Sequence, residues 1–295
     1  MRRKNGVLRI MTVPFIDLAT QQRRLRPEID ARLNKVLDHG RYIMGPEVDE
    51  LEANLCKRLN VKHTISCSSG TDALILGLLG LGVNPGDGVI VPSFTFAASA
   101  EAIAVLGAVP IFAEVEETSF NLDPDRLVDA LAAGQKAGLN VVGVIPVGLF
   151  GQPAALDRIA TFSQDNGLWM LDDAAQSFGA TLSEKIVGTF GSATATSFFP
   201  AKPLGCYGDG GALFTNDDQL AAIARSARVH GQGADKYENE RLGMTARLDT
   251  MQAAVLLAKL GIFDEELALR QQAADRYADR LAGSGVIIPE LCATA

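Results

Sequence analysis

Short apolar runs that suit β-strands alternate with helix-like runs between residues 64 and 172, and this alternation constrains the fold more than any other feature. The strand-like runs are 64–67, 89–91, 109–113, 141–147 and 168–172. Helix-like runs separate them: 73–81, a run ending at Leu106, 124–133 and 154–166. Strands joined in this way form a mostly parallel sheet with helices on both faces. We therefore predict an α/β fold, whose ligands should bind in the loops after the carboxyl ends of the strands.

Composition excludes several classes of protein. The chain has 295 residues, 47% of them hydrophobic and 21% charged, which indicates a globular protein with a sizeable core. Its net charge of −8 argues against a nucleic-acid partner. No apolar stretch approaches the length of a membrane span. The four cysteines contain no CxxC pair, and only three histidines are scattered along the chain, so we expect no disulfide framework, no metal site and a cytoplasmic location.

Small hydroxyl residues and a glycine mark the first strand-to-helix junction. Ser69, Gly70 and Thr71 stand between the strand-like run and the helical run that follows. Free amide groups at such a helix N-terminus, together with the helix dipole, form an anion site. The alternative is a simple N-cap that binds nothing. Both interpretations fit this junction taken alone.

An unusual lysine lies between two later strand-like runs, 193–199 and 212–215. Pro200 and Pro203 flank Lys202 and make its backbone stiff and non-helical, and a glycine-rich turn follows. A lysine held in this way suits a Schiff base, because its amine must lose a proton before it attacks a carbonyl. The alternative is an ordinary solvated lysine in a turn.

Two further loops carry candidate groups. Asp172 and Asp173 end an apolar strand and should point to opposite faces, one as a cap and the other as a functional carboxylate. Phe94 and Phe96 follow another strand and either face a ligand ring or fill the core. A phosphate site, a stacking ring, an acid and a lysine are together what pyridoxal phosphate requires.

Five segments now carry a resemblance to a known family. They are Ser69-Gly-Thr-Asp-Ala-Leu74, Pro92-Ser-Phe-Thr-Phe96, Asp173-Ala-Ala-Gln176, Ser197-Phe-Phe-Pro-Ala-Lys202-Pro-Leu-Gly205 and Arg247-Leu-Asp-Thr-Met-Gln-Ala-Ala254. With them the chain resembles the DegT/DnrJ/EryC1/StrS sugar aminotransferases from about residue 13 to residue 289. The resemblance implies the type I aminotransferase fold, with a mostly parallel seven-stranded sheet flanked by helices and a small C-terminal domain.

The resemblance also implies roles for single residues. Lys202 matches the Schiff-base lysine that moves the substrate proton, and Asp173 matches the partner of the pyridine nitrogen. The remaining cofactor contacts implied are Gly70, Thr71 and Ser197 at the phosphate, Phe96 on the ring, and Gln176 beside the cofactor.

One segment departs from the family pattern. Family members carry an asparagine in a Gly-x-Asn-x-Arg motif, which reaches the phosphate of the neighbouring subunit. This chain has Thr245 at that position, between Gly243 and Arg247. A hydroxyl can still donate a hydrogen bond, so Thr245 stays a candidate contact in a homodimer with shared sites. His230, beside a glycine in the preceding loop, is expected to be structural.

The function implied is transfer of an amino group from glutamate to a keto nucleotide sugar, in surface-polysaccharide or amino-sugar biosynthesis. A sugar dehydratase of the same fold is the rival enzyme, but those proteins carry histidine in place of the lysine. An inactive fragment that binds the cofactor is the third reading.

The resemblance divides the chain into three regions. We expect a tail at residues 1–12, a cofactor-binding large domain at 13–250, and at 251–295 connecting helices and the start of a small domain that is largely missing.

Overall fold

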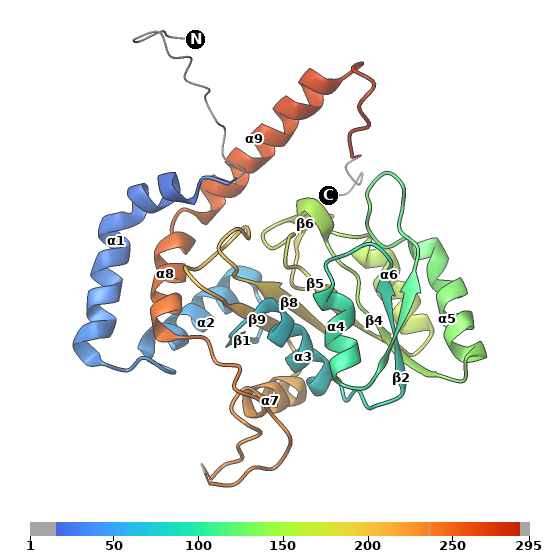
Figure 1. Ribbon diagram of the computed structural model, residues 1–295, viewed down its shortest axis with the longest axis horizontal. Coiled ribbons are helices and arrows are strands. Elements are labelled where there is room, and N and C mark those ends of the chain that lie inside the picture. Colours follow the sequence, from blue (N-terminus) through green and yellow to red (C-terminus); the bar gives the residue numbers. More distant parts are fainter. Residues whose placement is uncertain (1–15, 236, 290–295) are drawn as a thin grey trace, which may run out of the picture.

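A seven-stranded sheet runs through the computed structural model, which describes residues 16–235 and 237–289 (Figure 1). Its spatial order is β1 (His63–Cys67), β9 (Gly211–Thr215), β8 (Ala193–Ser197), β5 (Trp169–Asp173), β4 (Asn140–Val144), β2 (Asp87–Pro92) and β3 (Val109–Ala113). β9 is antiparallel to both of its neighbours, and the other paired strands are parallel. The predicted mostly parallel sheet is confirmed.

Three helices cover one face of the sheet: α3 (Gly70–Gly80), α4 (Ala98–Val105) and α7 (Asp218–Ala227). The chain caps two of them with polar side chains. Ser69 accepts a hydrogen bond from the amide of Asp72 at the start of α3, and Asp217 accepts two from the first turn of α7. Leu76 and Leu78 of α3 and Ile103 of α4 are fully buried, in one apolar cluster with Leu171 and Leu213 of the sheet. This packing fixes the N-terminus of α3 at the edge of the sheet.

The opposite face carries α2 (Pro46–Leu59), α5 (Leu127–Lys136) and α6 (Leu156–Asp165). α2 packs around Phe214 of β9, whereas α5 and α6 pack around Ile90 of β2 and Val144 of β4. The short elements of this half are two 3-10 turns, η1 (Pro124–Arg126) and η2 (Leu149–Gly151), and a hairpin, β6 (Thr181–Leu182) with β7 (Lys185–Ile186).

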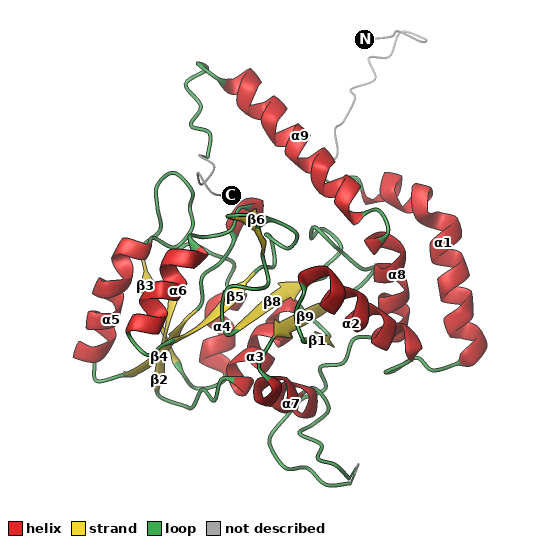
Figure 2. Cartoon of the chain, turned by 180° about the vertical axis from the view of Figure 1, so that it is seen from behind, coloured by secondary structure: helices red, strands yellow, loops and turns green. Residues whose placement is uncertain are grey.

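Three helices form a layer beside the β1 edge: α1 (Leu18–His39), α8 (Thr250–Leu260) and α9 (Phe263–Leu281). α1 packs on α8 through a small apolar cluster, and α8 also contacts α2. α9 projects away from the sheet, and Phe263 is its buried residue (Figures 1 and 2). Gly261 ends α8 and separates it from α9.

The structure also bears on two boundaries. The helix α1 begins at Leu18, where Asp17 caps it, and it accommodates Pro27 in its interior. The predicted tail at 1–12 lies outside the described residues, so the predicted division into domains stays a prediction. Among the described residues, no helix is long and apolar enough to cross a membrane.

Candidate active site

Asp173 lies at the carboxyl end of β5, and its carboxylate is held from two directions. The Ser99 hydroxyl of α4 donates to Oδ2 at 2.8 Å, and the Ala175 amide donates to Oδ1 at 3.1 Å. The residue is 6% exposed. Burial raises the pKa of Asp173, while the bonds from Ser99 and Ala175 and the positive charge of Lys202 oppose that rise. The carboxylate is therefore stabilised by groups placed specifically around it.

Asp172 has the opposite surroundings. It is 1% exposed, and neither of its carboxyl oxygens has a hydrogen-bond partner in the described part of the chain. Burial, with a smaller contribution from the charge of Asp173, raises the pKa of Asp172 to about 8. The two side chains point to opposite faces of β5, as predicted for adjacent strand residues. Of the two carboxyl groups, Asp173 is the one whose pKa is affected by the charge of Lys202.

Lys202 lies in the connection between β8 and β9. Its amide donates to the carbonyl of Phe199 at 2.8 Å, which closes a tight turn around Pro200. Its side chain is half-buried, and burial lowers the pKa of the amine while the charge of Asp173 partly offsets this. A lowered pKa increases the fraction of neutral amine, which is the form that attacks a carbonyl.

The N-terminus of α3 meets the end of β8. A Cβ atom placed on Gly70 would lie 2.7 Å from the Cβ of Ser197, so glycine is required for this close approach. The hydroxyl of Ser69 accepts a hydrogen bond from the amide of Asp72. The amides of Gly70 and Thr71 lie in the same first turn, where a helix supplies no internal acceptor. These amides and the hydroxyl of Ser197, which we call the Gly70–Ser197 cradle, are the groups that could hold a phosphate here.

Phe96 and Gln176 flank this edge of the sheet. Phe96 precedes α4, and its carbonyl accepts a hydrogen bond from the Ser99 amide at 3.2 Å. The residue is 70% exposed. An exposed aromatic face in this position is suited to stack on a planar ring. Gln176 lies three residues after Asp173, and its Oε1 accepts from the amide of Phe150 at 2.9 Å.

Thr245 is not part of this group within one chain. Its hydroxyl is 2.7 Å from Nε2 of His230, and this pair is exposed. The segment that contains both residues forms a loop beside α7 (Figure 1). The predicted contact between Thr245 and a neighbouring subunit stays a prediction. The structural role expected for His230 also stays a prediction.

Sequence analysis missed Ser99. It is fully buried, and its hydroxyl also lies 3.1 Å from that of Thr95, so a chain of polar groups leads to Asp173. The sequence feature that could have indicated Ser99 is a hydroxyl residue in the first turn of the helix after Phe96. That signal could not identify Asp173 as the partner, because the contact depends on how α4 lies over β5.

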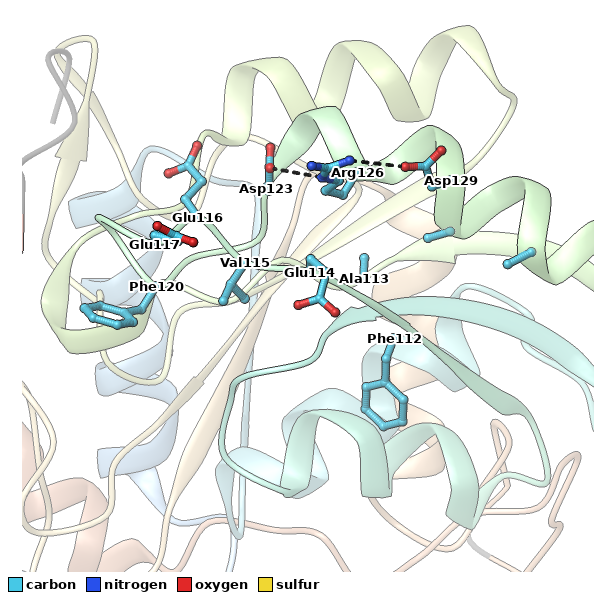
Figure 3. Close-up of a pocket in the computed structure, with 12 residues that line it drawn as sticks. Phe112, Ala113, Glu114, Val115, Glu116, Glu117, Phe120, Asp123, Arg126 and Asp129 are labelled. Carbon is cyan, nitrogen blue, oxygen red and sulfur yellow. Dashed lines mark ion pairs between the residues drawn. The ribbon is translucent and has the colours of Figure 1, made fainter.

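A separate pocket lies next to the end of β3 and does not contain any predicted site residue. Figure 3 shows acidic side chains along it, with Arg126 between Asp123 and Asp129 at 3.8 and 3.6 Å. No group of three or more metal-binding side chains occurs among the described residues.

Comparison with known proteins gives consistent matches along the chain. The model of the DegT/DnrJ/EryC1/StrS aminotransferase family matches residues 23–292. The chain is 48% identical over 277 residues to a UDP-2-acetamido-2-deoxy-3-oxo-D-glucuronate aminotransferase of Pseudomonas aeruginosa, covering 94% of this chain and 75% of that protein. It is 41% identical to a dTDP-3-amino-3,4,6-trideoxy-alpha-D-glucose transaminase of Streptomyces venezuelae, covering 94% of this chain and 72% of that protein.

Solved structures agree. A DegT DnrJ EryC1 StrS aminotransferase from Brucella abortus superposes with a TM-score of 0.93 at 48% identity, covering 96% of this chain and 76% of that one. The ntda protein of Bacillus subtilis, solved with the bound cofactor PMP, gives a TM-score of 0.83 at 30% identity, covering 96% of this chain and 64% of that one.

Proposed function

Because this chain belongs to the DegT/DnrJ/EryC1/StrS aminotransferase family, we propose that it moves an amino group from glutamate to a keto nucleotide sugar, with Lys202 and Asp173 as the catalytic pair. It is a sugar aminotransferase, and its cofactor is pyridoxal phosphate. One observation carries the assignment of residues: a half-buried lysine whose pKa is lowered interacts with a buried carboxylate at the edge of the sheet that also holds the Gly70–Ser197 cradle.

The described residues fit this cofactor. The α3 N-terminus and Ser197 would hold the phosphate, Phe96 would cover one face of the ring, and Lys202 would bind the aldehyde. When bound, pyridoxal phosphate supplies an electron sink for the substrate carbon. The negative charge of Asp173 is placed to keep the ring nitrogen protonated, and Ser99 holds its carboxylate in position.

Lys202 has two tasks in this proposal. Its amine binds the cofactor between turnovers and carries a proton to and from the substrate carbon during them. Both tasks require a neutral amine for part of the cycle, and partial burial provides it by lowering the pKa. The rival sugar dehydratase is disfavoured, because such enzymes carry histidine at this position.

The acceptor proposed is a UDP-linked 3-oxo sugar acid, by similarity to the Pseudomonas aeruginosa enzyme. Such a product belongs to amino-sugar or surface-polysaccharide biosynthesis. We also propose a homodimer with shared sites, in which Thr245 reaches the partner's phosphate, and a cytoplasmic location. The free cysteines Cys56, Cys67 and Cys206 support that location.

Visible absorption spectroscopy tests the assignment. Glutamate should convert the band of the lysine-bound cofactor into that of pyridoxamine phosphate, and addition of the keto nucleotide sugar should reverse the change. Lys202→Ala should abolish both the original band and the turnover, with an unchanged circular dichroism spectrum. Lys185→Ala, which removes an exposed lysine of the β6–β7 hairpin, should behave as the parent does. A Lys202→Ala protein that keeps the band of the lysine-bound cofactor and still converts glutamate would contradict the proposal.

A further inference from the structure

Three phenylalanine side chains gather near the candidate active site. Phe94 follows β2, Phe120 lies between β3 and η1, and Phe150 lies in η2 after β4. Their ring centroids are 6.0 Å apart for Phe94 and Phe120, 6.4 Å for Phe94 and Phe150, and 6.0 Å for Phe120 and Phe150. Each ring thus contacts the other two at distances typical of aromatic pairs. We call this group the phenylalanine cluster.

Two residues of the cluster are exposed and the third, Phe120, is half-buried, and two of the three have a strained backbone. Phe94 is 50% exposed and Phe150 is 64% exposed. Phe120 has φ 62° and Phe150 has φ 57°, values that bulky residues rarely adopt and that cost free energy. Phe150 is both strained and exposed, so its conformation contributes little to the stability of the fold. Such strain is most often found where a site requires it.

Two connections tie the cluster to the candidate active site. The Phe150 amide donates to Oε1 of Gln176 at 2.9 Å. Phe94 stands two residues before Phe96, in the loop that leads to Ser99 and its bond with Asp173. Two loops therefore carry cluster residues and residues of the site. A molecule that reacts at Lys202 and extends along this edge would meet the cluster.

Charge restricts what can bind there. Glu114, Glu116 and Glu117 line the adjacent pocket, and Figure 3 shows Phe120 beside Glu117. These carboxylates repel a phosphate, whereas a flat neutral ring is attracted to exposed aromatic faces. Stacking of a nucleobase on aromatic side chains is strong and tolerates different bases.

We propose that the phenylalanine cluster is the platform on which the nucleobase of the keto nucleotide sugar stacks. The inference rests on the proposed function, because it supposes that the acceptor carries a nucleotide. The diphosphate would cross between the cluster and the catalytic pair, away from the acidic pocket.

Binding of uridine 5′-diphosphate and of pyrophosphate to the cofactor-loaded protein, measured by calorimetry, tests the platform. The parent should bind the nucleotide at least tenfold more tightly than pyrophosphate. Phe94→Leu keeps an apolar side chain but removes the aromatic face, and it should weaken nucleotide binding by roughly five- to a hundredfold. Pyrophosphate affinity and the glutamate half-reaction should stay unchanged. Phe94→Trp should restore the nucleotide affinity.

Phe112→Leu is the matched control. Phe112 is an exposed phenylalanine of β3 that points away from Phe120 in Figure 3, so its replacement should not change nucleotide affinity. Equal affinities of the parent for the nucleotide and pyrophosphate would overturn the platform. So would a Phe94→Leu protein with unchanged nucleotide affinity, or one whose only defect is a weaker dimer. In each case the glutamate half-reaction would still report separately on the proposed function.

Discussion

Asp172 and Asp173 are adjacent in sequence, yet their carboxyl groups differ in what surrounds them. Asp173 receives hydrogen bonds from Ser99 and Ala175 and interacts with Lys202, whereas the buried Asp172 has no hydrogen-bond partner among the described residues. We therefore expect Asp173→Asn to lower transamination by roughly 100- to 1000-fold, since a preorganised charge is lost from the site. Asp172→Asn should cost much less. Steady-state rates of both variants would check this. Equal or reversed losses would mean that Asp173 is not the carboxylate that acts in the site.

Asp172 should instead affect stability through pH. Its pKa is about 8 in the folded chain and roughly 3.9 when unfolded, so between these values the folded state binds more protons. Stability should then fall as pH rises through this window, by up to about 1.4 kcal/mol per pH unit. Asp172→Asn should remove that slope. Urea unfolding between pH 5 and pH 7.5 measures it.

The control for this experiment is Asp218→Asn. Asp218 is exposed, and hydrogen bonds from His63 and Lys62 lower its pKa, so its carboxylate titrates below the window. This variant should retain the slope of the parent. If the free energy of unfolding of the parent and of Asp172→Asn changed equally with pH, Asp172 would not be protonated in the folded state.

Ser99 should set the acid limit of activity. Its hydrogen bond lowers the pKa of Asp173 against the effect of burial, so Ser99→Ala should raise that pKa. The rate of the glutamate half-reaction should then begin to fall at a higher pH than in the parent, because Asp173 is protonated sooner. Ser93→Ala removes an exposed hydroxyl that bonds Glu114 at 3.3 Å, and its pH profile should not move. Identical profiles for the parent and Ser99→Ala would refute the positioning role.

Among the elements, the ion pair of Glu52 and Arg228 joins α2 to the residue that ends α7. Arg228 Nη1 donates to Glu52 Oε1 at 2.6 Å and to the Ser66 carbonyl of β1 at 2.8 Å, and both side chains are largely buried. Arg228→Met leaves a buried carboxylate without its counter-ion and should destabilise the fold by roughly 3–5 kcal/mol. Chemical denaturation would measure the loss.

An exposed pair provides the comparison. Arg158 and Asp125 are also 2.6 Å apart, but both are more than half exposed, so Arg158→Ala should cost at most about 1 kcal/mol. The double variant Glu52→Leu with Arg228→Met should recover part of the loss, because no uncompensated charge remains. A loss for Arg228→Met as small as that for Arg158→Ala would mean that the pair does not join these elements.

The elements show what sequence could and could not predict. The strands and their alternation with helices follow from local apolar patterns, and the helix predicted at 73–81 corresponds to α3 within a few residues. The start of α1 at Leu18 does not follow from apolar spacing, because a polar cap, Asp17, defines it. In the site, glycine, proline and carboxylate positions mark the loops. Ser99 could not be predicted, since its contact joins α4 to β5 through tertiary packing.

At the scale of the whole molecule, one chain supplies most of the predicted site but not Thr245. The loop with Thr245 extends beside α7, and the exposed Thr245 hydroxyl bonds His230 (Figure 1). In a two-fold dimer the same loop of each subunit would meet the other's site, which gives two equivalent sites. Exposed Tyr42, Phe199 and Leu242 are further surface that a partner would cover. The proposed dimer would account for the separation of this segment of the family motif from the other motif residues.

The dimer leads to a prediction about cofactor affinity. Threonine is shorter than asparagine, and its hydroxyl is already engaged with His230, so its hold on a partner's phosphate should be weak. A neutral hydrogen bond contributes roughly 1 kcal/mol, so Thr245→Asn should tighten pyridoxal phosphate binding about fivefold. Thr245→Val, which keeps the shape without the hydroxyl, should not tighten it. Light scattering gives the oligomeric state, and titration of the apoprotein gives the affinity. A monomer whose cofactor affinity is the same for all three side chains would contradict a site shared between subunits.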